Sequence, residues 1–586
     1  MKAFRASAIG VVLIVCISVA ALAQGQPPIG IPVPPWEIKQ IAPIDPSPPI
    51  QDVAPAQWQP PIGIPVPPWG ITQVAPSDPS PWIQDVPGFY YVDSTVAAAT
   101  DTNNPHGWPG QPRKTIPNIV PAGSVVELRG AYSRAHTSPY TLHLNGTSTA
   151  PVFVRGANSS SRPVVTAGWE ISGTYFIVEN ITFACCGVAI IAPVNTGALR
   201  NSEVRGTLTS GGMFIGSWAY PAITTNFVVL GCVIHDNGDV NAAFDQDKHG
   251  IGIGWNGGAD HIWILDSEFY RNSGDGIQIA AGNPTRQASV NHIYVGRNVS
   301  HHNKQSGFWS KQAVDVIFSQ NVVYGHRRGN SSYGSGMGFQ YAPERIWFLF
   351  NHIYDNDFGI GLSSDSGLGT GTNSYFVGNV IHNIHAFSGG FNPNSAWSNA
   401  AFMMAGGVNR WVVDNTVYDI EGGINLPGGG NVYAANNIIA GLSAAGGRHI
   451  FLESVNSTAA STLKNTLIGE APRLSWGSAA TFTSVSSFQS ATGKGLNTIV
   501  ASPSFVNATT GDFHLNSVSP GTNAGTVESV YDTFLSLYGL DIRKAADGVP
   551  RPAVGASSDL GAYQTTGTRG IGTPPAAPRS LRITSQ

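Results

Sequence analysis

A short motif, an asparagine followed by any residue and then an aliphatic residue, returns along residues 298–467. Its six copies are Asn321-Val322-Val323, Asn351-His352-Ile353, Asn379-Val380-Ile381, Asn415-Thr416-Val417, Asn437-Ile438-Ile439 and Asn465-Thr466-Leu467. Successive copies start 22–36 residues apart, and a glycine-rich turn usually follows each copy. A motif that repeats in this way, with its length variation in the turns, is typical of a solenoid.

The motif predicts an all-β fold, a right-handed single-stranded parallel β-helix of roughly 10–13 coils with an N-terminal cap and an irregular C-terminal cap. Alternate aliphatic side chains would fill the interior, and strands of successive coils would stack about 4.7–4.9 Å apart. An asparagine turned inward at the same corner of each coil could bond to the asparagine of the next coil. The alternative is a β-sandwich with unrelated Asn-rich turns, which six copies in one frame disfavour.

The composition excludes one large class of function. Only 11% of the 586 residues are charged, the formal net charge is −4, and 69 residues are glycine. A nucleic-acid-binding protein needs a basic face, so we expect no nucleic acid partner. The many glycines suit a β structure with tight turns.

Residues 1–23 have the pattern of a secretory signal peptide. Lys2 and Arg5 form a basic start, residues 9–20 an apolar core, and Ala21-Leu22-Ala23 a small-residue cleavage site. The apolar run is too short for a membrane span. We therefore expect a mature chain that is secreted, periplasmic or on the cell surface, has no membrane span and is a monomer.

The mature chain would keep three cysteines, Cys185, Cys186 and Cys232. An odd number cannot form a complete disulfide framework, although one pair is possible. Buried free thiols in successive coils are the preferred interpretation.

Residues 24–87 are rich in proline and contain a duplication. Residues 26–36 return unchanged as residues 59–69, an offset of 33. Proline removes hydrogen-bond donors and favours extended polyproline II, so this segment is predicted to be a semi-rigid linker. The alternatives are a ligand for a proline-recognising partner, or a segment that contacts the cell wall through Trp36 and Trp69.

Residues 88–500 are the predicted β-helix domain, which opens with Phe89-Tyr90-Tyr91-Val92-Asp93 and continues through residues 115–132. This opening resembles that of secreted bacterial β-helix proteins of the pectate-lyase-like superfamily. The resemblance implies a strand and a short helical cap at the N-terminal end, although Pro117 disfavours a full helix.

Residues 501–565 resemble the closing segment of many secreted bacterial β-helix proteins. The resemblance rests on Ser519-Pro520-Gly521, Arg551-Pro552 and Asp559-Leu560-Gly561-Ala562-Tyr563. We expect this segment to cap the open end of the solenoid, where unpaired backbone groups would otherwise be exposed. Residues 566–586 are predicted to form a tail.

Five strands align on a glycine that follows His249, Asp275, Ser306, Ser335 or Phe358. The alignment predicts two inward columns, which are Ile251, Ile277, Phe308, Met337 and Ile360, and then Ile253, Ile279, Ser310, Phe339 and Leu362. Small residues surround the outward Trp309 and Lys311, which is the pattern of a groove with an aromatic platform and a cation.

The pectate-lyase-like superfamily holds polysaccharide lyases, uronate epimerases, inverting glycoside hydrolases and non-catalytic surface proteins. Its members usually place their substrate along one lateral face, and the fold alone does not choose among them. The resemblance therefore implies a carbohydrate-active protein whose partner is a polysaccharide. Because the predicted site is basic whereas the whole protein is mildly acidic, we expect that polysaccharide to be anionic.

A lyase or epimerase acting on a uronic-acid polymer must neutralise the carboxylate and remove the C5 proton. We predict His249 or Lys311 as the base and Asp275 as the group that orients His249. Arg271, with Arg327 or Arg328, would neutralise the substrate.

Further residues are predicted to contact the sugar or a metal ion. Oxygen ligands from Asp245 and Asp247 could bind Ca²⁺. The predicted substrate-binding residues are Trp309, Arg327, Arg328, Trp255, Gln278, Tyr341 and Lys248. Each group also has a structural interpretation, such as a turn for the two aspartates and a solvated loop for the two arginines.

Two alternatives to the lyase stay open. An inverting hydrolase needs two carboxyl groups roughly 6.5–9.5 Å apart, which Asp247 and Asp275 could supply. His249-Gly250 faintly resembles the His-Gly motif of the polygalacturonase family, but that family's paired-Asp and Arg-x-Lys motifs are not visible. The third possibility is a non-catalytic glycan-binding surface protein or adhesin.

Overall fold

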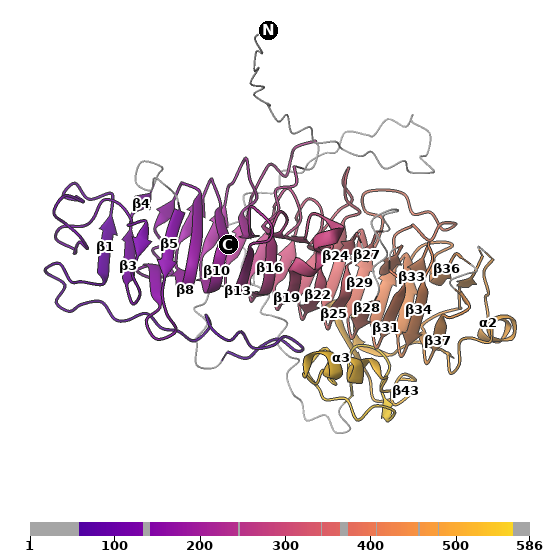
Figure 1. Ribbon diagram of the computed structural model, residues 1–586. Coiled ribbons are helices and arrows are strands. Elements are labelled where there is room, and N and C mark those ends of the chain that lie inside the picture. Colours follow the sequence, from indigo (N-terminus) through magenta and orange to yellow (C-terminus); the bar gives the residue numbers. More distant parts are fainter. Residues whose placement is uncertain are drawn as a thin grey trace, which may run out of the picture. The chain divides into compact units, whose positions relative to one another are not determined.

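The repeated strands stack into a parallel β-helix, as predicted (Figure 1), and their sheets form the three walls of a tube. The computed structural model describes residues 58–132, 141–243, 246–341, 343–363, 373–405, 407–454, 458–478 and 480–565. Their strands form a 26-stranded parallel sheet, which supplies two walls, and a 14-stranded parallel sheet, which supplies the third. The predicted signal peptide and the first copy of the proline-rich repeat lie outside the described residues.

The strands of the first wall are β1 (Phe89–Asp93), β3 (Val125–Arg129), β6 (Val152–Gly156), β13 (Ile223–Leu230), β16 (Gly258–Leu265), β19 (Val290–Gly296), β22 (Val314–Ser319), β25 (Glu344–Leu349), β28 (Asn373–Val377), β31 (Asn409–Val413), β34 (Asn431–Ala435) and β37 (Thr462–Lys464). The strands of the second wall are β2 (Ile119–Val120), β5 (Thr141–Asn145), β12 (Met213–Gly216), β15 (Ile251–Gly254), β18 (Ile277–Ala280), β21 (Phe308–Lys311), β24 (Ser335–Gln340), β27 (Phe358–Leu362), β30 (Phe402–Met404), β33 (Gly422–Leu426), β36 (Arg448–Leu452) and β39 (Leu474–Trp476). The long strands β8 (Trp169–Glu179) and β10 (Val188–Arg200) run through both walls.

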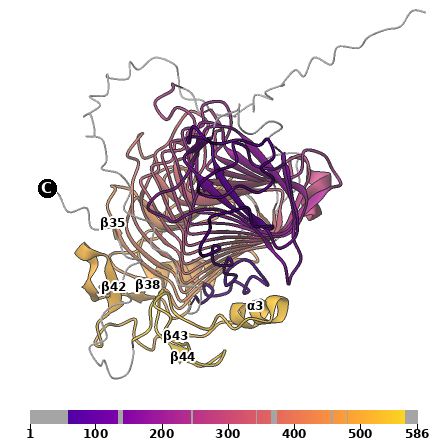
Figure 2. The same cartoon turned by 90° about the vertical axis from the view of Figure 1, so that its left-hand side faces the viewer.

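The strands of the third wall are β4 (Ala131–Tyr132), β7 (Val164–Val165), β9 (Thr182–Ala184), β11 (Glu203–Arg205), β14 (Val233–His235), β17 (Glu268–Tyr270), β20 (Val299–His301), β23 (Val322–Tyr324), β26 (His352–Asn356), β29 (Val380–Ile384), β32 (Thr416–Ile420), β35 (Ile438–Leu442), β38 (Leu467–Ile468) and β40 (Ile499–Val500). Figure 2 views the tube from the end where the described strands begin, with the walls enclosing a common interior. Alternate aliphatic side chains of all three walls are buried there in one continuous apolar core.

The predicted asparagine ladder is confirmed at the corner between the first and third walls. Its rungs are side-chain amide bonds from Asn298 to Asn321 (3.1 Å), Asn321 to Asn351 (2.9 Å), Asn351 to Asn379 (3.0 Å), Asn379 to Asn415 (2.9 Å) and Asn415 to Asn437 (3.0 Å). The sixth motif copy does not continue the ladder, because Leu467 pairs with Ile438 and Asn465 therefore falls one position early. The amide of Asn465 bonds to Asn436 in the neighbouring column.

A second polar ladder runs along the corner between the third and second walls. The amide of Asn237 donates to Asn272 (2.8 Å), and that of Asn272 donates to Asn303 (2.8 Å). His326 continues the column, 3.3 Å from the amide of Asn303 and 3.0 Å from Asn356. Each buried amide thus finds its partner in the next coil, which fixes how the coils stack.

A column of apolar side chains points outward from the first wall and is shielded from solvent by other segments of the chain. In register order it contains Phe153, Ile177, Ala198, Val228, Trp263, Tyr294, Ile317, Trp347, Tyr375, Trp411 and Tyr433. Two segments from opposite ends of the described chain cover it, and both pack into the same apolar cluster.

The first cover is a proline-rich strap, residues 58–76, which contains the second copy of the duplicated sequence. Ile64 and Ile71 are buried against the column, and Trp263 donates its indole N–H to the carbonyl of Pro65 (2.9 Å). The guanidinium of Arg200 donates to the carbonyls of Ile71 (3.1 Å) and Gln73 (3.0 Å). This half of the predicted linker is therefore part of the folded body, because its apolar side chains complete the surface of the first wall.

The second cover is the helix α3 (Val530–Tyr538), where Phe534 packs edge-on against Trp347. The two covers meet at Gly63, where an added Cβ would lie 3.0 Å from a methyl carbon of Ile542 and 3.2 Å from the ring of Phe534.

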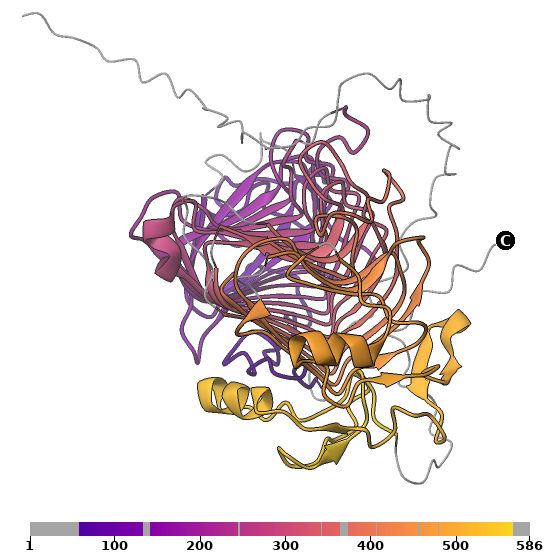
Figure 3. The same cartoon turned by 90° about the vertical axis from the view of Figure 1, so that its right-hand side faces the viewer.

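The predicted closing segment runs along the outside of the tube rather than across its end. It contains α3, the 3-10 helix η4 (Ala508–Thr510) and the antiparallel pairs β41 (Phe505–Asn507) with β42 (Asp512–Leu515) and β43 (Gly525–Thr526) with β44 (Ser557–Ser558). The C-terminal end is instead covered by α2 (Val485–Thr492), whose Phe488 is buried against Trp476 and Phe482 (Figure 3). At the other end, residues 94–118 form turns, and the described part of that cap contains no helix.

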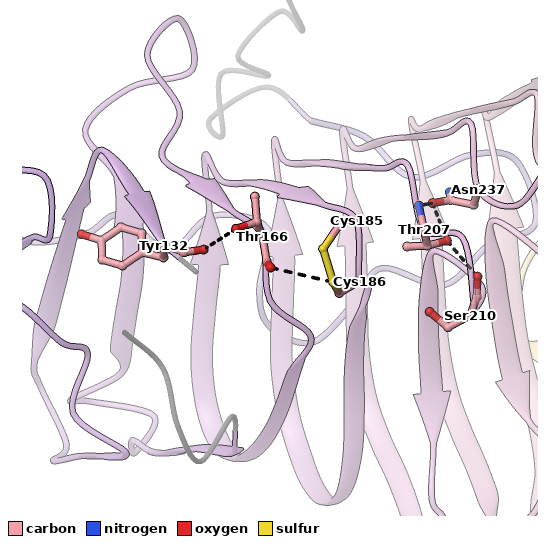
Figure 4. Close-up of a disulfide and its surroundings, with 7 residues drawn as sticks. All are labelled: Tyr132, Thr166, Cys185, Cys186, Thr207, Ser210 and Asn237. Carbon is pink, nitrogen blue, oxygen red and sulfur yellow. Dashed lines mark hydrogen bonds between the residues drawn. A yellow bond between two sulfur atoms is a disulfide. The ribbon is translucent and has the colours of Figure 1, made fainter. Parts of the chain in front are cut away.

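The cysteine interpretation is wrong for two of the three residues. Cys185 and Cys186 form a disulfide between neighbouring residues, at the corner between the third and second walls (Figure 4). Cys232 is free and buried, as expected. Sequence spacing could not show the pairing, because adjacent cysteines are close in every fold.

Candidate functional site

The strand alignment on the second wall is confirmed residue by residue. Ile251 pairs with Ile277, Ile277 with Phe308, and Phe308 with Met337, so the inward column lies as predicted. Because neighbouring residues point to opposite faces, the outward column contains Thr141, Glu170, Ala189, Phe214, Gly252, Gln278, Trp309, Gly338 and Gly361.

His249 and Asp275 lie together at the start of two neighbouring strands of this wall. The backbone N–H of Asp275 donates to Nδ1 of His249 (2.9 Å), and a carboxylate oxygen of Asp275 lies 3.5 Å from the same nitrogen. Both side chains are buried, with 3% of each residue exposed. Asp275 therefore contacts His249 chiefly through its backbone amide, and the predicted catalytic role of the pair stays a prediction.

Burial sets the charge of both groups. It lowers the pKa of His249 to about 3, and the nearby charges of Lys311 and Lys248 act in the same direction. Burial raises the pKa of Asp275 to about 7, against the opposing effect of Lys311 and of a 2.9 Å bond from the amide of Gln278. At neutral pH the imidazole is uncharged.

The uncharged imidazole is an unsuitable base in this geometry. Its Nδ1 accepts a hydrogen bond from a backbone N–H, so the ring proton resides on Nε2. His249 can therefore donate a hydrogen bond to a ligand, whereas the predicted role of general base requires a free ring nitrogen.

Trp309 is not the exposed platform that was predicted. Only 7% of the residue is exposed, and a Cβ atom at Gly338 would collide with its indole ring. The glycine column therefore forms a slot in which the indole lies flat. Lys311 projects beyond it, with Nζ 5.7 Å from the centre of the Tyr341 ring. Gln278 is also buried, and its amide is used by Asp275.

The predicted arginines lie at the corner between the third and second walls, each near an acidic residue. Arg271 bonds to Asp236 (2.6 Å), and Arg327 bonds to Asp355 (2.9 Å). The backbone N–H of Arg328 donates to Asp357 (2.8 Å). The guanidinium groups of Arg271 and Arg327 thus bind acidic residues of neighbouring coils, which opposes the role of neutralising a substrate.

The predicted calcium ligands receive no support from the described residues. Asp245 lies outside them, and Asp247 accepts a 2.6 Å hydrogen bond from the amide of Gln305. Among the described residues, Asp247 belongs to no group of three or more potential metal ligands. Ca²⁺ usually takes six to eight oxygen ligands, so calcium binding by Asp245 and Asp247 stays a prediction.

A groove of about 740 Å³ opens on the second wall, beside β8, β10, β12 and β15. Its lining includes the aromatic residues Phe214, Trp218 and Trp255 and the acidic residues Glu170 and Asp247. His249 also lines it, so the groove reaches one side of the predicted site. No arginine or lysine of the described residues is among those that line it.

Two tryptophans present open surface in this groove. Trp218 is 52% exposed and Trp255 is 38% exposed, in contrast to the buried Trp309. Trp218 stacks on Phe214 with ring centroids 4.6 Å apart, and its indole N–H donates to Glu170 (3.2 Å). The carboxylate thereby fixes the orientation of the exposed ring.

The disulfide forms part of the same lining. Cys186 is exposed and lines the groove, and its sulfur lies 3.8 Å from the carbonyl oxygen of Thr166 (Figure 4). Joining neighbouring residues in a ring removes backbone freedom from this turn. The side of the groove that Cys186 lines is therefore preorganised.

Glu170, Phe214, Trp218 and Cys186 were missed by sequence reasoning. One signal was present, because residues 211–218 repeat the glycine and aliphatic pattern of residues 249–255 one coil earlier. Extending the alignment by that coil places Phe214 beside Gly252, as the structure does. Glu170 and Cys186 have no comparable signal in the sequence.

No family model and no curated protein matches this chain. Solved structures that match include the Dettilon tailspike protein (14% identity, 60% of this chain, TM-score 0.35) and a GH136 lacto-N-biosidase from Eubacterium ramulus (15%, 60%, TM-score 0.41). An alginate lyase from Paenibacillus sp. str. FPU-7 matches at 17% identity over 54% of this chain, with a TM-score of 0.32. The aligned regions span 63%, 67% and 93% of those three chains, and such likenesses assign no activity to this one.

Proposed function

We propose that this protein is an exported glycan-binding β-helix protein that holds an uncharged stretch of glycan in the groove beside β8, β10, β12 and β15. The observation that carries the proposal is the pair of exposed tryptophans, Trp218 and Trp255, in one groove that also contains carboxylates and a neutral imidazole. Flat aromatic faces suit the apolar faces of sugar rings, while carboxylate and imidazole groups can bond to hydroxyls.

The charge of the groove favours an uncharged glycan over the anionic polymer predicted from the sequence. Glu170 and Asp247 line the groove, and no cation of the described residues does. A uronic-acid carboxylate would meet these acids without a neutralising partner.

Export is supported by the chemistry of the chain itself. A disulfide persists in oxidising compartments, which agrees with the signal-peptide pattern of residues 1–23. No helix of the described residues is long and apolar enough to cross a membrane.

Glycoside hydrolysis is the second candidate function. It is favoured by the presence of two carboxylates, Glu170 and Asp247, in the same groove. One could act as general acid and the other as base or nucleophile. The lyase prediction has weaker support, because Lys311 is not among the groove-lining residues and the two best-placed arginines bind acids elsewhere.

A panel of uncharged and uronic-acid polysaccharides tests these functions on the purified mature chain. Binding is measured by calorimetry, hydrolysis by new reducing ends, and lyase action by ultraviolet absorbance of unsaturated products. We expect binding to an uncharged glycan, weakened about tenfold by Trp218→Ala and by Trp255→Ala. Trp397→Ala is the matched control, since Trp397 is 42% exposed and does not line the groove.

Two results would overturn the proposal. The first is equal binding by the wild type and both groove variants. The second is binding only to uronic-acid polymers, which would also restore the lyase and epimerase predictions if unsaturated or epimerised products appeared.

A further inference from the structure

Two histidines and an aspartate meet where strands β16 and β19 of the first wall begin. Asp260 and Asn291 are partners in the register of these strands, and His261 and His292 follow them directly. Both histidines have left-handed backbones, with φ of 56° and 51°, so their side chains leave the sheet in the same direction. The two imidazoles stack with centroids 4.3 Å apart.

Donor atoms of these residues converge on one point. Nδ1 of His261 lies 2.8 Å from a carboxylate oxygen of Asp260, and Nδ1 of His292 lies 3.0 Å from the same oxygen. The three residues each offer one ligand atom, and all three atoms lie within 4.8 Å of one another. The amide oxygen of Asn291 also contacts Nδ1 of His292.

Among the described residues, the ion-pair partners of Asp260 are the two histidines. Asp315, the next acidic residue along this corner, is held by both nitrogens of the Arg345 fork (2.7 and 2.8 Å) and by Tyr538. Asp260 pairs with the two imidazoles, and no lysine or arginine of the described residues forms an ion pair with it. The three residues are half-buried, so an ion could reach them from solvent.

We propose that Asp260, His261 and His292 form a binding site for a borderline divalent metal ion such as Zn²⁺ or Cu²⁺. Imidazole nitrogen with carboxylate oxygen is a donor set that these ions favour, whereas Ca²⁺ requires more oxygens. Ligand atoms about 2.0–2.1 Å from zinc at tetrahedral angles lie roughly 3.3 Å from one another. The two Nδ1 atoms lie 2.8 and 3.0 Å from the Asp260 oxygen, close to that value. Water would complete the coordination.

The position of the site gives it a structural role. Asp260 and His261 belong to one coil and His292 to the next, so a bound ion would join two coils on the first wall. The groove lies on the second wall, and the metal proposal does not depend on glycan binding. A ligand that binds only the folded state stabilises it by mass action, so the ion should raise the melting temperature.

Calorimetry with Zn²⁺ on the untagged mature chain, first stripped with a chelator, tests the proposal. We expect one site, and His261→Ala and His292→Ala should each weaken Zn²⁺ binding ~10-fold or more. Mutation of residues that only hydrogen-bond to metal ligands already lowers metal affinity by about this factor. His143→Ala is the control, because His143 is exposed and bonds to Ser172 outside the cluster. Unchanged Zn²⁺ affinity in both cluster variants would overturn the proposal.

Electron paramagnetic resonance of bound Cu²⁺ gives a second readout that identifies the ligands. The wild type should show coupling to two imidazole nitrogens, and either histidine variant should show coupling to one. Asp260→Asn keeps both imidazoles, so it should retain both couplings while binding the ion more weakly. Loss of both couplings in His301→Ala would place the site on the third wall and refute this assignment.

Discussion

The backbone N–H of Asp275 donates a 2.9 Å hydrogen bond to Nδ1 of His249, which joins two residues 26 positions apart in the chain. This bond decides the tautomer of the imidazole, because an accepting Nδ1 leaves the proton on Nε2. His249 is thus set up as a hydrogen-bond donor at the edge of the groove.

Two substitutions separate the two nitrogens of His249. The shorter asparagine can place an acceptor near the position of Nδ1 but no donor near that of Nε2. The longer glutamine can place a donor near the position of Nε2 but no acceptor near that of Nδ1. We expect His249→Asn to keep the stability of the fold and lose glycan affinity. His249→Gln should keep more of the affinity but lose about 1–3 kcal/mol of stability, because the buried N–H of Asp275 loses its acceptor. Chemical denaturation and calorimetry measure both effects, and equal losses in the two variants would contradict the assignment.

Asp275→Asn should stabilise the protein increasingly as the pH rises. The pKa of Asp275 is raised from 3.8 to about 7, so the folded state binds more protons than the unfolded state between these values. The stability that this group contributes at low pH is therefore lost as the pH rises towards 7. The free energy of unfolding of the variant, relative to the wild type, should be larger at pH 8 than at pH 4.5 by on the order of 1–4 kcal/mol. Denaturant titrations at the two pH values test this, and an unchanged difference would show that Asp275 ionises as in water.

Asn351 lies inside the asparagine ladder, so its removal should be costly. Asn351→Ala leaves the amide and backbone N–H of Asn321 without their acceptor. We expect a loss of about 2–4 kcal/mol in the free energy of unfolding. Asn394→Ala is the control, because Asn394 is exposed. Similar melting temperatures for the two variants would argue against a structural role for the ladder.

Gly70 directly follows the second copy of the proline-rich repeat and packs closely against the first wall. Its φ is +93°, and an added Cβ would lie 3.1 Å from the Cβ of Ala198. The first copy is followed instead by Glu37, with Lys39 at the position that corresponds to Thr72. Gly70→Glu should destabilise the docked strap by about 1–3 kcal/mol, while Thr72→Lys at an exposed position should have little effect. Thermal denaturation and limited proteolysis compare the pair, and equal behaviour would contradict the close packing of Gly70.

The cysteine pairing predicts a definite count of reactive thiols. Before reduction, the denatured mature chain should take up one alkylating group at Cys232, and after reduction it should take up three. In the native state even Cys232 should react slowly, because burial raises the pKa of its thiol to about 12. Mass spectrometry counts the groups, and three additions without reduction would refute the disulfide.

Most of the tube could be predicted from the sequence, because its strands obey a local rule. Glycine followed by alternating aliphatics places Ile251, Ile277 and Phe308 in one column, and the structure has that register. The Asn298–Asn437 ladder follows the same rule, since its members fall at one corner of every coil.

The candidate site was harder to predict, because exposure depends on what neighbouring coils contribute. Trp309 and Trp218 are both tryptophans near second-wall strands. Gly338 in the next coil lets Trp309 lie buried, whereas Trp218 projects from a turn over Phe214. The repeat predicts on which wall a residue lies. It does not predict whether the side chains of neighbouring coils bury that residue or leave it exposed.

The strap also has a consequence for how the chain is made. Trp58 bonds to a residue 208 positions later, and Ile62 to one 258 positions later. A ribosome therefore produces the strap long before the surface on which it rests, and closing such long loops is slow. The strap residues, although synthesised before the surface that they cover, are thus among the last to reach their final place.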